Sequence, residues 1–105
     1  MSNFFEKVYK LSEQVPSGKV TTYGAIANNL GFPRSGRMIG WAMRQAPSNI
    51  CWYRVIKKTG ELSFPEFSES FNEQKNLLQK ENITFTDNKH VDLKKHFWCN
   101  WENPG

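Results

Sequence analysis

A glycine and a proline separate two short helical patterns in the middle of the chain. Residues 23–30 carry apolar side chains at helical spacing, and Thr21 or Thr22 before them can act as an N-cap. Gly31 stands where the end of a helix favours a left-handed residue, and Pro33 cannot continue the helix. The sequence therefore predicts a short helix that ends at this turn.

A further helical pattern follows the turn. It begins at Ser35, extends to about Met43, and would bury Met38, Ile39 and Ala42 on one face. Two short helices across a glycine-containing turn are typical of a helix-turn-helix.

The flanking segments would complete the core around this pair of helices. Residues 3–12 predict an amphipathic first helix with Ser2 as its N-cap, residues 71–81 a later helix, and residues 83–85 a short extended segment. A C-terminal segment would close over the core with four large apolar residues, Val91, Leu93, Phe97 and Trp98.

A small hairpin is predicted directly after the helix-turn-helix. Residues 53–57 alternate in hydrophobicity, Thr59 and Gly60 favour a turn, and residues 61–64 can return as a second strand. A chain of 105 residues is long enough for one core and too short for two. We therefore expect one domain over 1–105, mainly α with a small β wing, as a single winged helix-turn-helix.

Positive charge is concentrated in one part of the chain. From Gln14 to Gly60 there is no Asp or Glu, although the whole sequence has a net charge of +4. The cations of this stretch are Lys19, Arg34, Arg37, Arg44, Arg54, Lys57 and Lys58. Because Lys and Arg gain binding energy by displacing counterions from phosphates, this distribution favours a polyanionic partner over a merely solubilising surface.

Other classes of protein are not favoured. The first fifteen residues are charged and lack the apolar core of a signal peptide, and no run is apolar enough for a membrane span. Cys51 and Cys99 form no CxxC motif, so we expect a reduced, cytoplasmic protein, nucleoid-associated if bacterial. The spacing of His90, His96 and Cys99 matches no standard zinc finger. No metal and no cofactor is predicted.

An ordered series of short motifs runs from Gly18 to Val55. In sequence they are GKVTTYGAIA, a proline, GRMIGWAM and CWYRV. This series resembles the DNA-binding domain of the O6-alkylguanine-DNA alkyltransferases, whose pattern is GxVxTYGxIA, a proline, ARxVGxAM and PCHRV. Val91, Asp92, Leu93 and Trp98 add a match near the C-terminus. The matching positions in the main series are Gly18, Val20, Thr22, Tyr23, Gly24, Ile26, Ala27, Pro33, Arg37, Gly40, Ala42, Met43, Arg54 and Val55.

One departure from the family pattern bears on function. The position of the alkyl-accepting cysteine is occupied by Trp52, as in the alkyltransferase-like proteins. Alkyl transfer needs a thiolate, whereas an indole nitrogen is only a hydrogen-bond donor. The activating histidine is replaced by Tyr53, and the preceding proline by Cys51, whose side chain we expect to point to the opposite face.

The resemblance implies how this chain would hold DNA. Arg37 would enter the duplex in place of an everted guanine, Tyr23 would press on the neighbouring phosphate, and Thr22 would cap a helix, contact phosphate or do both. Small residues would let the helix from Ser35 approach the minor groove, and Trp41 would lie away from DNA. The DNA-binding residues predicted on this basis are Thr22, Tyr23, Arg34, Ser35, Gly36, Arg37, Gly40 and Arg54.

The resemblance also implies a pocket for the everted base. The loop from Thr59 to about Ser68 would close it. An Arg that contacts the lesion in some relatives has no counterpart here, because Phe64, Pro65 and Phe67 occupy that neighbourhood. The predicted lining is Tyr23, Met43, Trp52, Tyr53 and Ser63.

The function implied by the resemblance is recognition without catalysis. We expect a monomer that binds O6-alkylguanine in duplex DNA through the minor groove, flips the nucleotide, and marks the lesion for nucleotide excision repair proteins, with no cofactor and no membrane. Two alternatives stay open at this point: an alkyltransferase that uses Cys51, and a generic winged-helix transcription regulator.

Overall fold

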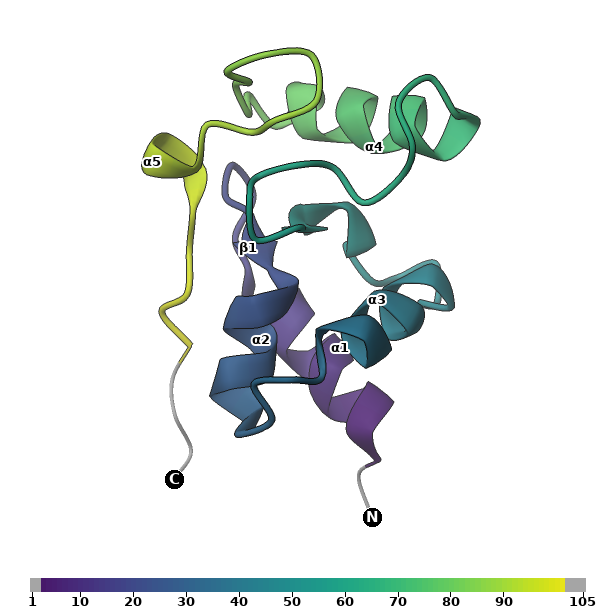
Figure 1. Cartoon of the computed structure of the whole chain (residues 1–105), viewed down its shortest axis with the longest axis vertical. Helices are drawn as coiled ribbons and strands as arrows, with labels where there is room; N and C mark the ends of the chain where they lie inside the picture. The colour runs from purple at the N-terminus through teal and green to yellow at the C-terminus, as the bar shows by residue number, and fades with distance from the viewer. Residues whose placement is uncertain (1–2, 102–105) are drawn as a thin grey trace.

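The computed structural model describes residues 3–101, and its helices form two groups at opposite ends of the molecule (Figure 1). The first group consists of α1 (Phe4–Gln14), α2 (Tyr23–Leu30) and α3 (Gly36–Arg44). The second consists of α4 (Glu69–Lys80) and the short α5 (Leu93–His96). Between them lie β1 (Thr21–Thr22), the 3-10 turn η1 (Trp52–Arg54) and β2 (Val55–Ile56). None of the described helices is long and apolar enough to cross a membrane.

Local capping residues fix the ends of the first two helices. The side chain of Asn3 caps α1 by accepting a hydrogen bond from the backbone N–H three residues later at 2.8 Å. The predicted cap, Ser2, lies outside the described residues. Thr22 caps α2 in the same way at 3.1 Å, and Gly31 ends that helix with φ 83°. The predicted bounds of α2 are therefore confirmed.

The buried residues form two cores, where the sequence predicted one. The first core joins α3 to α1 and α2, which gives the predicted helix-turn-helix. From α3 the buried residues are Ile39, Ala42 and Met43. The prediction that Met38 is buried is wrong, because it precedes Ile39 by one residue on the helix and is 50% exposed. The core is completed by Val8, Leu11, Val15, Ile26, Ala27, Val55 and Trp101.

The small sheet pairs segments that are far apart in sequence. β1 and β2 run parallel, with Thr21 opposite Val55 and Thr22 opposite Ile56. Because the strands run parallel, the start of α2 lies beside the end of β2, and η1 enters β2 beside the start of β1. Tyr23 and Lys57, which follow the two strands, are thereby held in one region of the molecule.

The predicted antiparallel hairpin after β2 does not form as two paired strands. One hydrogen bond of 3.0 Å from Lys57 N–H to Glu61 O closes the expected turn. Beyond the turn, Glu61 instead forms an antiparallel bridge with His90. The physical reason is burial. Leu62 is fully buried in a second core with Phe71 of α4, so this segment pairs with the segment around His90 and not with β2.

The C-terminal segment returns along β1 and α2 towards the N-terminal helices (Figure 1). Val91 is buried in the second core and Trp98 packs against the first, as predicted, while Phe97 is 41% exposed. Trp101, which the sequence did not single out, is buried and donates its indole N–H to Leu11 O at 2.8 Å. A mainly helical helix-turn-helix fold with a small sheet is confirmed.

Candidate nucleic-acid interface

A groove runs beside the exposed face of α3. Arg37, Trp41 and Arg44 follow one another at spacings of four and three residues, so they share one face of the helix. All three side chains are exposed. The groove is lined by Tyr23, Gly36, Arg37, Gly40, Trp41, Arg44, Lys57 and Ser63. This lining includes three cations and no carboxylate, which suits a phosphate-bearing partner.

The two glycines of α3 are not required by packing within the protein. A Cβ atom at Gly40 would meet nothing within 4 Å, and one at Gly36 would only touch Tyr23 Cβ at 4.0 Å. Glycine in a helix interior costs roughly 1 kcal/mol relative to alanine. The space beside these glycines instead leaves the backbone of α3 open to close approach from outside.

Tyr23 connects this groove to the segment after β2. Its hydroxyl donates a hydrogen bond to Ser63 Oγ, and Ser63 in turn donates to Val55 O at 3.1 Å. The Ser63 backbone N–H donates to Gln74 Oε1 of α4 at 3.0 Å. Burial raises the pKa of Tyr23 above its ordinary value of 10.0. Tyr23 and Ser63, both predicted to line the pocket of Trp52, therefore lie together on the groove wall and not in that pocket lining.

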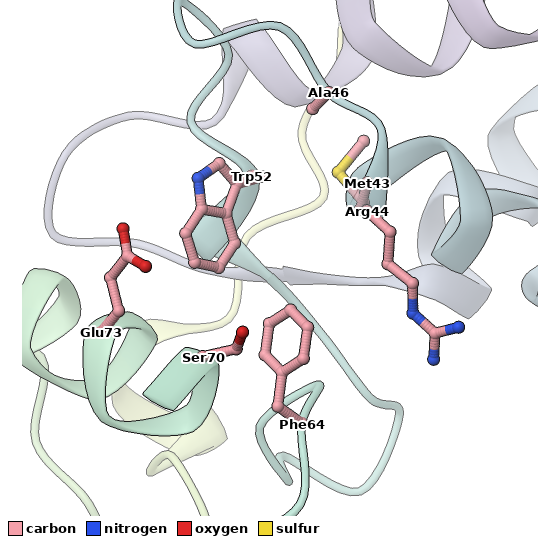
Figure 2. Close-up of a pocket in the computed structure, with 7 residues that line it drawn as sticks. All are labelled: Met43, Arg44, Ala46, Trp52, Phe64, Ser70 and Glu73. Carbon is pink, nitrogen blue, oxygen red and sulfur yellow. The ribbon is translucent and has the colours of Figure 1, made fainter. Parts of the chain in front are cut away.

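Trp52 lines a pocket next to the C-terminal end of α3 (Figure 2). Its indole makes edge-to-face contacts with Tyr53, at 5.8 Å between ring centroids, and with Phe64, at 5.9 Å. Met43 lies across the pocket, as the resemblance implies. The full lining is Met43, Arg44, Ala46, Trp52, Phe64, Ser70 and Glu73. Arg44 belongs to both the pocket and the groove, so the two adjoin.

Arg54 is occupied within the protein, which corrects its assignment to DNA. Its guanidinium forms an ion pair with Glu81 and donates to Val15 O at 2.9 Å, and both charged side chains are only 13% exposed. Its Nε, Nη1 and Nη2 atoms all donate to groups of the protein, and Arg54 is not part of the groove lining.

Tyr53 belongs to the same polar cluster and not to the pocket lining, which corrects a second assignment. Its hydroxyl donates to Glu81 Oε2 at 3.0 Å and lies 3.7 Å from Cys51 Sγ. Burial, together with these hydrogen bonds, raises the pKa of Tyr53 to about 12. Tyr53 touches the pocket only through the edge of its ring against Trp52.

Thr22 also serves the fold. It is 6% exposed and its hydroxyl caps α2, so it positions Tyr23 and does not itself reach the groove surface. Arg34 and Ser35 line a second depression, which lies on the other side of Arg37 from the groove. Arg37 borders both depressions.

Trp41 was expected to lie away from DNA. It is 59% exposed and lines the groove with Arg37. Helical spacing alone would have placed it there. Phe64 belongs to the loop from Thr59 to about Ser68 that was expected to close the pocket. Ser70 and Glu73 were not predicted as pocket residues, because they come from a helix that only the fold brings against Trp52.

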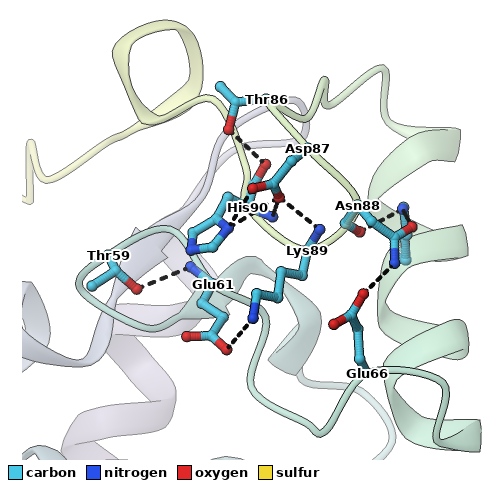
Figure 3. Close-up of polar contacts among 9 residues, drawn as sticks. Thr59, Glu61, Glu66, Thr86, Asp87, Asn88, Lys89 and His90 are labelled. Atoms are coloured by element: carbon cyan, nitrogen blue, oxygen red, sulfur yellow. Dashed lines mark hydrogen bonds and ion pairs between the residues drawn. The ribbon is translucent and has the colours of Figure 1, made fainter.

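The remaining cysteine and histidine residues lie outside the pocket. Cys51 is half-buried beside the Tyr53 hydroxyl and is not part of the Trp52 pocket lining. His90 contacts Asp87 at 3.0 Å within a polar loop (Figure 3). Hydrogen bonds from the backbone N–H of Lys89 and from His90 lower the pKa of Asp87. Within residues 3–101 no group of three His, Cys, Asp or Glu side chains could hold a metal ion.

Comparison with known proteins places the whole arrangement in one family. Residues 3–83 match the family model described as 6-O-methylguanine DNA methyltransferase, DNA binding domain. A DNA base-flipping protein of Vibrio parahaemolyticus is 33% identical over 100 residues, which cover 93% of this chain and 98% of that protein. Alkyltransferase-like protein 1 of Schizosaccharomyces pombe is 33% identical, with 93% and 96% covered.

A solved structure of a relative has the same fold as this chain. The crystal structure of Schizosaccharomyces pombe Atl1 in complex with damaged DNA containing O6-carboxymethylguanine superposes with a TM-score of 0.82 at 31% identity. The match covers 93% of this chain and 98% of that one.

Proposed function

This chain belongs to the family of the 6-O-methylguanine DNA methyltransferase DNA-binding domain, and we propose that it recognises O6-alkylguanine in duplex DNA by nucleotide flipping, without removing the alkyl group. The observation that carries this proposal is the position of Trp52. Its indole lines a pocket that adjoins the basic groove of α3, at the sequence position of the alkyl-accepting cysteine. An indole cannot act as the nucleophile that alkyl transfer requires.

The groove beside α3 supports binding through the minor groove of DNA. Gly36 and Gly40 leave the helix backbone open to close approach, and Arg37 projects from between them. A flipped nucleotide costs a few kcal/mol of lost stacking and pairing. The planar guanidinium of Arg37 would offset this cost by stacking between the neighbouring base pairs and hydrogen-bonding to the orphaned cytosine.

The pocket supports binding of the everted base. Trp52 and Phe64 present aromatic surface and Met43 a flexible thioether, all suited to a purine and its alkyl group. Stacking of one base on an aromatic side chain is worth about 1–3 kcal/mol. Tyr23, held by Ser63 at the groove wall, would press on the phosphate beside the lesion.

A protein that binds a lesion without repairing it would act by marking it. We infer that this chain presents the distorted DNA to nucleotide excision repair proteins, working as a monomer in the cytoplasm. Pull-down of purified excision-repair proteins on lesion-containing duplex, with and without this protein, tests that step separately from DNA binding.

A binding titration with a mass measurement tests the central proposal. Wild type should bind a duplex with one O6-methylguanine more tightly than the unmodified duplex, and Arg37→Ala should weaken lesion binding about tenfold or more. Lys94→Ala, on α5 away from the groove, is the matched control for loss of one charge. Intact-mass measurement after incubation should show no added alkyl group. Equal affinity for both duplexes, or an alkyl adduct on Cys51, would overturn the proposal.

A further inference from the structure

The wall of the pocket that faces Trp52 carries a carboxylate. Glu73 extends from α4 towards the side of the pocket where the Trp52 indole lies (Figure 2). The Arg44 guanidinium points away from that indole, towards the groove that it also lines. Of the two charged groups in the pocket lining, the carboxylate is thus on the Trp52 side and the guanidinium is directed away from it.

The segment that supplies Phe64, Ser70 and Glu73 to the pocket is acidic. From Thr59 to Gln74 the sequence has four glutamates and no Lys or Arg. Glu61 pairs with Lys89 at 3.8 Å, and Glu66 accepts a hydrogen bond from Asn88 at 2.6 Å (Figure 3). Glu69 occupies the first turn of α4, where the helix dipole favours a negative charge.

Glu73 differs from these three glutamates. Within the described part of the chain it makes no ion pair, and its side chain is exposed at the pocket edge. Nothing in the fold therefore requires a carboxylate at this position. Because Glu73 lines the pocket, its charge can affect which O6-substituents bind there.

We propose that Glu73 makes this pocket selective for uncharged O6-substituents on guanine and disfavours anionic ones. The inference rests on the function proposed above, because it assumes that the O6-substituent points towards Trp52. A negatively charged substituent entering the pocket loses water and approaches a like charge, and both effects raise its free energy. A neutral substituent of the same shape avoids the repulsion, and one with an N–H or O–H can donate to the carboxylate.

The overall charge of the protein cannot produce this discrimination. The net charge of +4 would by itself favour a duplex that carries one more negative charge. Schizosaccharomyces pombe Atl1, of the same fold, forms a complex with DNA containing O6-carboxymethylguanine, so the fold itself admits that adduct. Selection against it in this chain would come from its own Glu73.

The test compares two substituents of nearly equal shape and different charge. Four duplexes of one sequence would carry guanine, O6-methylguanine, O6-carboxymethylguanine or its neutral amide, O6-carbamoylmethylguanine. Dissociation constants would be measured for wild type, Glu73→Gln and Glu69→Gln. The last variant is the matched control, since it removes the same charge from the same helix outside the pocket lining.

Wild type should bind the carbamoylmethyl duplex about three- to tenfold more tightly than the carboxymethyl duplex, a range set by partial solvent screening of an exposed charge. Glu73→Gln should bring that ratio close to one, and Glu73→Lys should invert it. Glu69→Gln should leave it unchanged.

The possible results distinguish a failure of the role of Glu73 from a failure of the proposed function. A wild-type ratio near one, or a ratio that Glu73→Gln leaves intact, overturns the role of Glu73 while preference for O6-methylguanine over guanine persists. Loss of preference for every alkylated duplex overturns the proposed function instead. Circular dichroism of each variant checks that the fold is retained, as expected for substitution of an exposed side chain.

Discussion

The Tyr23 hydroxyl donates its hydrogen bond to Ser63 Oγ, so the first turn of α2 is tied to the segment that follows β2. Tyr23 borders the groove of α3, and the neighbour of Ser63, Phe64, borders the Trp52 pocket. One hydrogen bond thus sets the spacing between the surface that would hold DNA and the cavity that would receive a base.

Tyr23→Phe should weaken binding to O6-methylguanine duplex by about tenfold, because losing one hydrogen bond of about 1 kcal/mol also frees the groove wall to shift. Binding to unmodified duplex should change much less, since the basic residues of the groove are untouched. Fluorescence anisotropy on both duplexes measures the two affinities. A variant that loses equal affinity for both duplexes would contradict a role of Tyr23 in eversion.

Trp41→Ala should weaken binding to both duplexes by a similar factor, about threefold to tenfold, because an exposed aromatic ring in a minor-groove interface contributes stacking and apolar contact. Met38→Ala is the comparison: Met38 is 50% exposed on α3 and lines the depression that contains Arg34 and Ser35, so its effect shows how far that side of Arg37 contacts DNA. If Trp41→Ala binds as wild type does while Met38→Ala does not, the DNA-facing side of α3 has been assigned wrongly.

Glu81→Gln should destabilise the fold by about 2–3 kcal/mol, because it leaves the Arg54 guanidinium partly buried without its counter-charge. Burial alone would raise the pKa of Glu81, but hydrogen bonds from Arg54, Gly18 and Tyr53 outweigh it and lower that pKa below its ordinary value of 4.5. The pair therefore stabilises the fold above pH 4.5 and loses its contribution as the pH falls through the lower, folded-state pKa.

Urea unfolding of wild type and Glu81→Gln between pH 7 and pH 3 measures this contribution. The difference in unfolding free energy should be largest at neutral pH and shrink on acidification. A constant difference across that range would mean that the carboxylate charge of Glu81 is not what stabilises the fold.

DNA affinity should fall with rising salt, with a slope of log affinity against log salt of about −4 for four to five phosphate contacts. Arg54 is no longer counted among these contacts, and Lys19 donates to Lys95 O at 3.2 Å instead. Arg44→Gln should make the slope shallower by about one. A slope close to zero in wild type would exclude phosphate contacts as the main source of affinity.

The sequence predicted the features that depend on neighbouring residues. Thr22 and Gly31 bound α2 as expected because a cap and a left-handed glycine act on the adjoining turn. The family pattern likewise placed Trp52 and Met43 in one pocket, since both positions are defined by motif register.

Features that depend on distant partners could not be predicted in this way. In the sequence, Arg54 is one of several cations in a basic stretch. Only the fold shows that Glu81 lies beside it and forms an ion pair with it. The segment after β2 was expected to pair with its immediate neighbour, but burial of Leu62 drew it to the chain near His90. Trp41 is the exception, because helical spacing from Arg37 was sufficient to locate it.

The parallel pairing of β1 with β2 has a consequence for how this protein acquires its binding site. Parallel strands cannot be joined by a tight turn, and here the connection between Thr22 and Val55 contains α2, α3 and η1. Such non-local contacts form late, after the entropy of closing the intervening loop has been overcome. A fragment ending before β2 would therefore keep helical segments but have no lesion pocket, and recognition would appear only with the last step of folding.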